Sequence, residues 1–235
     1  MLLPKASSPI FCYVTDRASL PGSELGDPLQ PLLDCIAAAA AADAHWIQLR
    51  EKDLSARDLA RLTRAAIARC ASINLRSANS AAPHARVIVN DRLDVAIAER
   101  AAGVHLGENS LSAGEAKRLL QNRFPENRPA EFLGGMSCHS LASAQAAAAD
   151  GADYIFFGPI FPTPSKQKYG PAQGLQRLAQ VCRSVSIPVL AIGGINVENA
   201  ARCLDSGASG IAAIRLFQQP SELQAAASFL RSFNA

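Results

Sequence analysis

The feature that most constrains the fold is an alternation of two kinds of segment, repeated eight times along the chain. Short runs rich in apolar, β-branched and aromatic residues predict strands, and longer Ala- and Leu-rich segments between them predict helices. The predicted strands are Phe11–Thr15, Trp46–Arg50, Arg86–Asn90, Gly103–Leu106, Phe132–Ser137, Tyr154–Gly158, Val189–Ile192 and Ile211–Ile214. The predicted helices are Pro31–Ala42, Ala56–Ala71, Leu93–Arg100, Ala113–Gln121, Leu141–Asp150, Gly174–Ser184, Val197–Ser206 and Ser221–Phe233.

Strands that alternate with helices form parallel βαβ units, and eight such units close into a barrel of about 250 residues. The chain has 235 residues, so the sequence predicts an α/β fold of one domain, a single (β/α)8 TIM barrel over residues 1–235. Its core would span about residues 11–217, with a C-terminal helix at residues 221–233. The alternative, an open doubly wound sheet, usually has fewer strands and an early G-x-G-x-x-G motif, which this chain lacks.

Composition argues against several classes of partner. The net charge of +3 is small, the basic residues are scattered and aromatic residues make up 6% of the chain, so no nucleic-acid surface is expected. No apolar run approaches the ~20 residues of a membrane span, and the N-terminus lacks the apolar core of a signal peptide. The six cysteines are widely spaced without a C-x-x-C motif, which indicates free thiols and a cytoplasmic protein. The oligomeric state stays open, a homo-oligomer included.

Several connections also have recognisable signals. Three segments without periodicity, Ser19–Pro28, Ser72–Pro83 and Gln121–Pro129, are expected to be loops. Gly151 and Gly207 each follow a predicted helix, where glycine commonly forms the C-terminal cap. Gly and Ala are adjacent before three predicted strands, Ala102-Gly103 among them, which indicates one turn type used several times.

In a barrel of this kind the functional residues lie at the carboxyl ends of the strands. The second predicted strand ends in Gln48-Leu49-Arg50-Glu51-Lys52. There Gln48, Arg50 and Lys52 share one side, because strand side chains alternate. This pattern fits an anion site and a solvated strand end with a salt bridge to Glu51 about equally well.

The third and fifth strand ends also carry polar residues. Asp91, after Asn90, is a hard oxygen ligand suited to Mg²⁺, although an Asp before a helix is more often an N-cap. Ser137 and His139 follow the fifth strand as candidate site groups, and the alternative for His139 is a hydrogen bond to backbone. His105 lies within the fourth strand and is expected to be buried and structural.

The last two strand ends with a functional signal point to phosphate. The loop after the sixth strand is Pro-rich and carries Thr163, Ser165 and Lys166, as expected of a lid, although a surface turn fits equally well. After the seventh strand, Gly193-Gly194 presents backbone N–H groups before a helix, where TIM barrels often bind phosphate. Glycine there would let an anion approach the backbone closely. Together the strand ends predict a substrate with a diphosphate beside a second substrate with a monophosphate.

These residues, in this order, resemble the thiamine phosphate synthase / TenI family. The resemblance extends from about Phe11 to Phe217, and it is specific because the segments occur together. The matching segments are Tyr13–Asp16, Gln48–Lys52, Val89–Arg92, Gly103–Gly107, Ser137–Ser140, Asp153–Thr163 and Val189–Ile195.

The resemblance implies a TIM barrel that joins hydroxymethylpyrimidine diphosphate to hydroxyethylthiazole phosphate, or to its carboxylated form, with release of diphosphate. The diphosphate would be held by Arg50, Lys52, Asn90 and Lys166, with Mg²⁺ on Asp91. Gln48 would hold the pyrimidine, and Ser137 would lie beside the leaving group. The thiazole substrate would contact Thr163 and Ser165, and its phosphate would contact Gly193-Gly194.

Two positions depart from the family pattern. Ser110 stands where the family's synthases usually have a second Mg²⁺-binding Asp, with Glu108 and Asn109 nearby as candidate substitutes. Arg215 stands where a small residue usually supports the thiazole phosphate. An Arg there either pairs with the phosphate or occupies space that the substrate needs.

Three functions stay open at this stage. The retained diphosphate-binding set favours the synthase. A TenI-type thiazole tautomerase would use His139 to carry a proton, and the missing second Asp favours it. A non-catalytic barrel that binds thiazole or thiamine phosphate and regulates a partner is favoured by Ser110 and Arg215.

Overall fold

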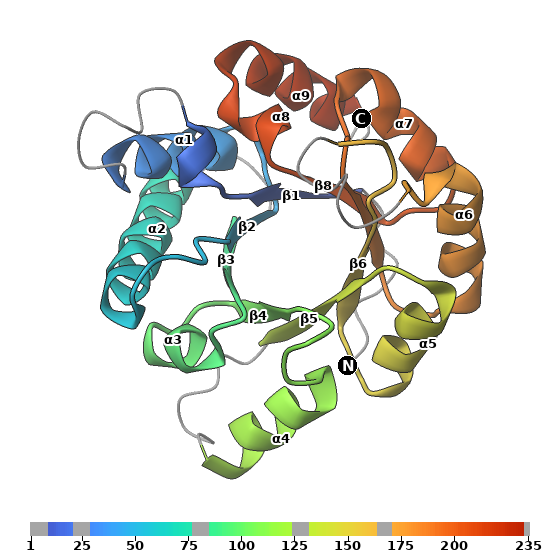
Figure 1. Cartoon of the computed structure of the whole chain (residues 1–235). Coiled ribbons are helices and arrows are strands. Elements are labelled where there is room, and N and C mark those ends of the chain that lie inside the picture. The colour runs from blue at the N-terminus through green and yellow to red at the C-terminus, as the bar shows by residue number, and fades with distance from the viewer. Residues whose placement is uncertain (1–8, 21–28, 77–84, 124–131, 164–170, 233–235) are drawn as a thin grey trace.

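The computed structural model describes residues 9–20, 29–76, 85–123, 132–163 and 171–232. Eight parallel strands form a closed barrel in sequence order, because β1 pairs with β8 as well as with β2 (Figure 1). The strands are β1 (Ile10–Val14), β2 (Trp46–Leu49), β3 (Arg86–Asn90), β4 (Gly103–Leu106), β5 (Leu133–Cys138), β6 (Tyr154–Phe157), β7 (Val189–Ile192) and β8 (Gly210–Ala213). The predicted (β/α)8 TIM barrel is confirmed, and β3, β4 and β7 have the predicted bounds.

Helices surround the barrel between successive strands (Figure 1). They are α1 (Leu29–Ala41), α2 (Ala56–Arg76), α3 (Leu93–Ala98), α4 (Ala113–Arg123), α5 (Leu141–Ala149), α6 (Gly174–Ser184), α7 (Val197–Asp205) and α9 (Pro220–Ser232). Two short elements were not predicted: the 3-10 turn η1 (Arg17–Ser19) after β1, and α8 (Arg215–Gln218) after β8.

The loop predictions need correction at their edges. Helix α2 continues to Arg76 and α4 to Arg123, so the loops predicted from Ser72 and from Gln121 begin too early. The residues added to α2 include the apolar Ile73 and Leu75, so its apolar pattern continues past the predicted end at Ala71. Most of the three predicted loops lies outside the described residues.

Strand side chains alternate between two hydrophobic cores. One core fills the barrel and consists of Ile10, Cys12, Val14, Trp46, Ile88, Leu133, Tyr154, Phe156, Leu190 and Ala212. The residues between them on the strands, such as Phe11 and Ile47, pack against the helices. Two residues beyond an inward-facing apolar residue, the strands carry Gln48 and Asn90. The barrel interior is therefore apolar through its centre and polar at the carboxyl ends of the strands.

One backbone turn connects helix to strand at four places. Its left-handed position is held by Asp43, Arg100, Gly151 and Gly207, with φ of 64°, 53°, 90° and 94°. In each turn the next N–H bonds to a carbonyl five residues earlier, as from Ala152 to Ala147 and from Ala208 to Cys203. The prediction of a repeated turn is confirmed. Ala102-Gly103 is not part of it, because Arg100 takes the left-handed position there and Gly103 lies in β4.

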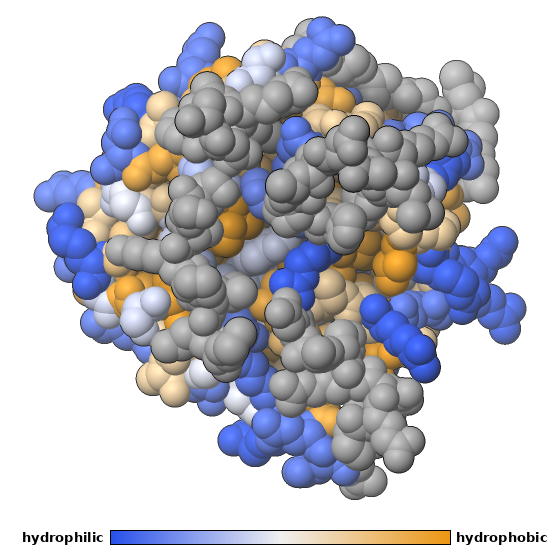
Figure 2. Space-filling view, turned by 180° about the vertical axis from the view of Figure 1, so that it is seen from behind, coloured by the Kyte–Doolittle hydropathy of each residue, from blue (hydrophilic) through white to orange (hydrophobic). Residues whose placement is uncertain are grey.

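The surface of the molecule carries a mixture of hydrophilic and apolar residues. Figure 2 shows hydrophilic residues around the periphery of one face and apolar residues nearer its middle. Among the helices of the described part of the chain, none has both the length and the apolar composition needed to cross a membrane. All six cysteines are free thiols, as predicted.

Candidate functional site

Side-chain hydrogen bonds link the carboxyl ends of β2 and β3. The Gln48 amide donates through Nε2 to Asn90 Oδ1 at 2.8 Å, and Asn90 Nδ2 donates to Asp91 Oδ2 at 2.8 Å. Gln48 is 2% exposed, and its Oε1 has no hydrogen-bond partner among the described residues. Because a buried acceptor without a partner costs free energy, this oxygen is suited to accept a hydrogen bond from a bound ligand.

Asp91 is oriented toward the end of β4. Its φ is 59°, and its Oδ1 accepts hydrogen bonds from Ser110 Oγ at 2.5 Å and from the Gly107 N–H at 3.1 Å. The interpretation of Asp91 as an N-cap is wrong, because α3 begins after Arg92 without a side-chain cap. Burial alone would raise the pKa of Asp91, but the hydrogen bonds from Ser110 and Gly107 and the charge of Lys52 outweigh it and lower the pKa. The carboxylate is therefore ionised at neutral pH.

The residue that lies beside the Asp91 carboxylate is Ser110, not a second carboxylate. Glu108 does not substitute for it, because Glu108 Oε1 accepts the His139 backbone N–H at 3.0 Å, at the start of α5. Within the described residues, no group of three His, Cys, Asp or Glu side chains could hold a metal. A single ionised carboxylate still fits Mg²⁺, which often binds one or two carboxylates together with substrate phosphates.

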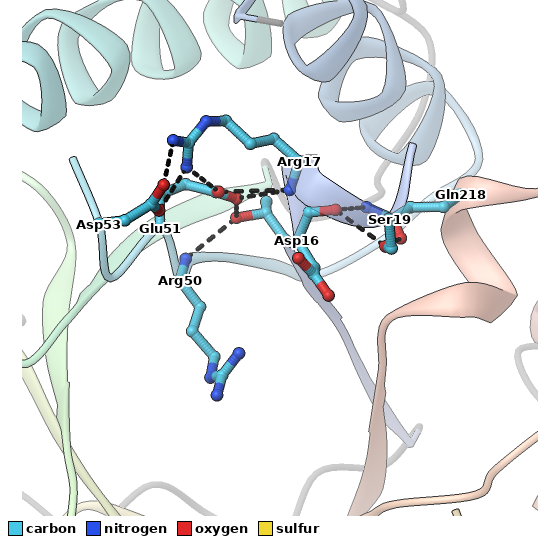
Figure 3. Close-up of polar contacts among 8 residues, drawn as sticks. Asp16, Arg17, Ser19, Arg50, Glu51, Asp53 and Gln218 are labelled. Carbon is cyan, nitrogen blue, oxygen red and sulfur yellow. Dashed lines mark hydrogen bonds and ion pairs between the residues drawn. The ribbon is translucent and has the colours of Figure 1, made fainter. Parts of the chain in front are cut away.

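Arg50 and Lys52 are not paired with the carboxylate between them. Glu51 is 5% exposed, and its Oε2 lies 2.9 Å from Arg17 Nη1 (Figure 3). The alternative of a salt bridge within the strand end is therefore wrong. The Arg50 side chain bonds to no described residue, and Figure 3 shows it pointing away from Glu51 and Arg17. Arg50 and Lys52 are thus available to bind an anion.

Ser137, near the end of β5, is held by the buried His105 of β4. His105 Nε2 lies 2.9 Å from Ser137 Oγ, and His105 Nδ1 lies 3.2 Å from the Tyr154 hydroxyl. Tyr154 is fully buried, and among the described residues only His105 Nδ1 accepts its hydroxyl hydrogen. Because buried donors need acceptors, the imidazole hydrogen is assigned to Nε2, from which it donates to Ser137 Oγ. The Ser137 hydrogen is then free to donate to a ligand.

The burial of His105 makes the stability of the fold depend on pH. Burial lowers the pKa of His105 to about 3 from 6.5, so between these values the unfolded chain binds a proton that the folded chain does not. The stability from this group is complete above pH 6.5 and is lost as pH falls, by about 1.4 kcal/mol per pH unit. In urea denaturation we expect the free energy of unfolding of the wild type to be about 1.4 kcal/mol lower at pH 5.5 than at pH 7.5, because the loss begins only near pH 6.5. This difference should be smaller in His105→Gln, and equal differences in both proteins would contradict the assignment.

His139 lies at the start of α5 and is exposed. Its Nδ1 lies 2.6 Å from the Gly158 carbonyl oxygen. Because a carbonyl only accepts, the hydrogen is assigned to Nδ1, and Nε2 carries a lone pair. The interpretation of His139 as a histidine bonded to backbone is confirmed, and Nε2 remains able to accept a proton.

The Gly193-Gly194 turn is packed against the segment after β6. Gly193 and Gly194 have φ of 94° and 67°. A Cβ on Gly193 would lie 2.5 Å from Pro159 Cβ, and one on Gly194 would lie 2.8 Å from Phe161 Cβ. The expectation that an anion explains both glycines is therefore corrected: contact with Pro159 and Phe161 already requires them. No described residue accepts a hydrogen bond from either glycine N–H, so these donors remain available for a phosphate.

The close contact at Gly193 predicts a large effect of a single methyl group. We expect Gly193→Ala to lower the free energy of unfolding by about 2–3 kcal/mol, because it combines a left-handed backbone with the clash on Pro159. Gly151→Ala is the matched control: φ is 90° there, but no atom lies within 4 Å of the added Cβ. Urea denaturation of both variants should show the larger loss for Gly193→Ala. Equal losses would mean that packing on the turn is loose.

Some of the remaining predicted site residues lie within the described part of the chain, and others do not. Thr163 is half-buried and has an interaction partner, whereas Ser165 and Lys166 lie outside the described residues. Arg215 is exposed and begins α8. Helix α8 is tied to the end of β1, because Gln218 Nε2 donates to the Asp16 carbonyl at 2.8 Å (Figure 3).

Sequence reasoning did not assign a site role to four residues near the barrel mouth. Thr15, Arg17 and Glu51 form a hydrogen-bonded cluster beside Arg50, and His105 was expected to be only structural, although it holds Ser137. A polar Thr-Asp-Arg run directly after an apolar strand was the one available signal for the cluster. That Thr15 and Arg17 contact Glu51, which follows the next strand, could not be known without the fold.

The fold and this geometry define a class of protein: a (β/α)8-barrel enzyme whose strand ends gather cations, amides and a carboxylate. The comparison with family models is more specific. The family described as thiamine monophosphate synthase matches residues 14–217, and this chain belongs to that family.

Individual relatives agree with this assignment. A thiamine-phosphate synthase of Methanoculleus marisnigri is 44% identical over 193 residues, covering 82% of this chain and 83% of the relative. One of Methanocella arvoryzae is 41% identical over 194 residues, covering 83% of each chain. The solved structure of a thiamine phosphate pyrophosphorylase from Pyrococcus furiosus is similar with a TM-score of 0.75 and 29% identity, covering 97% of this chain and 96% of that one.

Proposed function

We propose that this chain is a thiamine-phosphate synthase. It couples hydroxymethylpyrimidine diphosphate with hydroxyethylthiazole phosphate, giving thiamine phosphate and diphosphate; the carboxylated thiazole must also lose CO₂. The observation that carries the proposal is the hydrogen-bonded series from Gln48 through Asn90 to Asp91, bordered by Arg50, whose guanidinium has no partner among the described residues. Its cations and carboxylate suit a diphosphate, and a tautomerase has no use for a diphosphate site.

Each side chain of the site has a separate role in breaking one C–O bond. The C–O bond between the pyrimidine methylene and the diphosphate breaks, and its electron pair leaves with the diphosphate. The thiazole nitrogen then supplies the pair for the new C–N bond. Gln48 Oε1 accepts a hydrogen bond from the pyrimidine amino group, while Arg50 and Lys52 stabilise the developing charge on the diphosphate. The free hydrogen of Ser137 donates to the departing oxygen.

Mg²⁺ belongs to this proposal as a cofactor. Asp91 would hold it, with Asn90 beside it and the substrate phosphates completing its coordination. When bound, the ion neutralises charge on the leaving diphosphate. The lowered pKa of Asp91 supports this role, because the carboxylate stays ionised at neutral pH.

The second substrate would bind on the opposite side of the barrel mouth. Its phosphate would accept hydrogen bonds from the free N–H groups of Gly193 and Gly194, and Arg215 at the start of α8 would pair with it. The thiazole would contact Thr163, with Ser165 on the thiazole and Lys166 on the diphosphate from the segment that follows. The strand-7 and strand-8 ends of TIM barrels often bind phosphate, which supports this arrangement.

Thiazole tautomerisation is the second candidate, and one observation favours it. His139 Nε2 carries a lone pair and His139 is exposed, so this nitrogen is placed to accept a proton from a substrate. The family assignment and the relatives named thiamine-phosphate synthase favour coupling over tautomerisation and over a non-catalytic binding role. The free thiols of all six cysteines support a cytoplasmic location.

The two reactions respond differently to His139→Ala. We expect this variant to lose less than about tenfold in the rate of thiamine phosphate formation, because general acid–base catalysis by His139 is not required for coupling. If tautomerisation is the reaction, the same change should remove about 10²- to 10⁴-fold of its rate. Measuring both reactions in the wild type and in His139→Ala decides between them.

A further inference from the structure

Glu51 is a buried carboxylate between two residues, Arg50 and Lys52, that are proposed to bind a diphosphate. It lies between Arg50 and Lys52 in sequence, yet its side chain is directed toward the residues after β1 and away from the Arg50 side chain (Figure 3). Thr15 Oγ1 donates to Glu51 Oε1 at 2.6 Å, and Arg17 Nη1 lies 2.9 Å from Oε2. The Arg17 backbone N–H lies 3.2 Å from each carboxylate oxygen. All four contacts come from two residues just after β1, Thr15 and Arg17.

The Thr15 hydroxyl connects this carboxylate to Arg50. Thr15 is fully buried, and its Oγ1 accepts the Arg50 backbone N–H at 3.0 Å while it donates to Glu51. The Thr15 N–H also donates to the Gln48 carbonyl at 2.9 Å. One hydroxyl therefore fixes the peptide group from which the Arg50 side chain leaves the strand.

A gain in folding stability does not by itself explain the Glu51–Arg17 ion pair. Removing a carboxylate and a guanidinium from water costs free energy that their attraction often only just repays. The long Arg50 side chain has much rotamer freedom, so fixing its backbone narrows the positions that its guanidinium reaches. Displacement of a substrate-binding group by about 1 Å can cost about 10²-fold in rate.

We propose that Thr15 and Glu51, held by Arg17, are positioning residues that set the location of Arg50 for a diphosphate group. The proposal rests on the proposed function only in naming the substrate that carries this group. Arg17 also pairs with Asp53, which is 73% exposed, so the pair on the solvent side can be removed without touching the buried carboxylate.

Three variants separate positioning from packing. Thr15→Val keeps the shape and removes the hydroxyl, Thr15→Ser keeps the hydroxyl, and Asp53→Asn removes only the exposed partner. We expect Thr15→Val to weaken binding of inorganic diphosphate, measured by calorimetry with Mg²⁺, and to lower kcat/KM for coupling, each by about 10- to 100-fold. Thr15→Ser should restore both values, and Asp53→Asn should leave both near those of the wild type. Glu51→Gln should also lower diphosphate affinity and kcat/KM. It replaces Thr15→Val in the test if Thr15→Val does not fold.

A double variant tests whether Thr15 acts through Arg50. In an Arg50→Ala background, Thr15→Val should cause little further loss of diphosphate affinity, because the group that it positions is gone. Additive losses, or a lower Tm for Thr15→Val with unchanged diphosphate affinity, would overturn the proposal. Diphosphate binding that follows this pattern in a protein that makes no thiamine phosphate would support the positioning role and reject the proposed function.

Discussion

Arg50→Ala is expected to lower kcat/KM for thiamine phosphate formation by about 10²- to 10³-fold, the range for loss of one preorganised group that stabilises transition-state charge. The guanidinium has no partner among the described residues, and Figure 3 shows it directed away from the buried Glu51–Arg17 pair. Charge develops on the leaving diphosphate as the C–O bond breaks, so a fixed cation stabilises the transition state more than the ground state. Steady-state kinetics with varied hydroxymethylpyrimidine diphosphate should therefore show a loss in kcat as well as a higher KM.

Arg183→Ala is the matched control for this prediction. Arg183 is exposed in the last turn of α6, at the end of the helix away from the carboxyl ends of the strands. Its removal changes the net charge by the same amount and should leave the rate unchanged. The same large loss is predicted for Lys166→Ala. Near wild-type rates for both Arg50→Ala and Lys166→Ala would reject the diphosphate assignment.

The second large effect concerns Asp91. We expect Asp91→Asn to lower the rate of coupling at saturating substrates by about 10²- to 10³-fold and to raise the Mg²⁺ concentration needed for half-maximal activity. Asn fits the left-handed backbone of this position, with φ of 59°, and it keeps the side chain's shape. The loss would therefore come from the missing charge on the metal ligand. A Mg²⁺ titration of activity in both proteins measures it.

Ser110→Asp is the complementary variant. Ser110 Oγ lies 2.5 Å from Asp91 Oδ1, so a carboxylate at this position would stand next to the first one. We expect half-maximal activity of Ser110→Asp at a lower Mg²⁺ concentration than in the wild type, because two carboxylates bind the ion more tightly than one. If Asp91→Asn and the wild type have the same Mg²⁺ dependence, Asp91 is not the metal ligand.

The barrel and much of its mouth could be predicted from the sequence because both depend on local periodicity. Alternation along a strand places Gln48 and Arg50 on the inner side, and the carboxyl ends of parallel strands meet at one face. The family resemblance then assigned roles to residues that spacing alone left undecided. Asp91 illustrates this: its position before a helix favoured a cap, whereas the structure directs it to Ser110.

What could not be predicted depends on contacts between distant segments. The partner of Glu51 is Arg17, 34 residues earlier, and nothing local distinguishes it from a partner next to Glu51 in the chain. Similarly, Gly193 looked like an anion cradle, but its close neighbour is Pro159 from the preceding strand end. The four-residue helix α8 is too short for periodicity to detect.

The most direct test of the central claim is a turnover assay read by liquid chromatography. The protein is incubated with Mg²⁺ and hydroxymethylpyrimidine diphosphate and, in separate tubes, with each tautomer of the carboxythiazole phosphate. We predict that thiamine phosphate appears together with an equal amount of diphosphate. Interconversion of the two tautomers without thiamine phosphate would contradict the synthase assignment and make His139 the residue that carries the reaction.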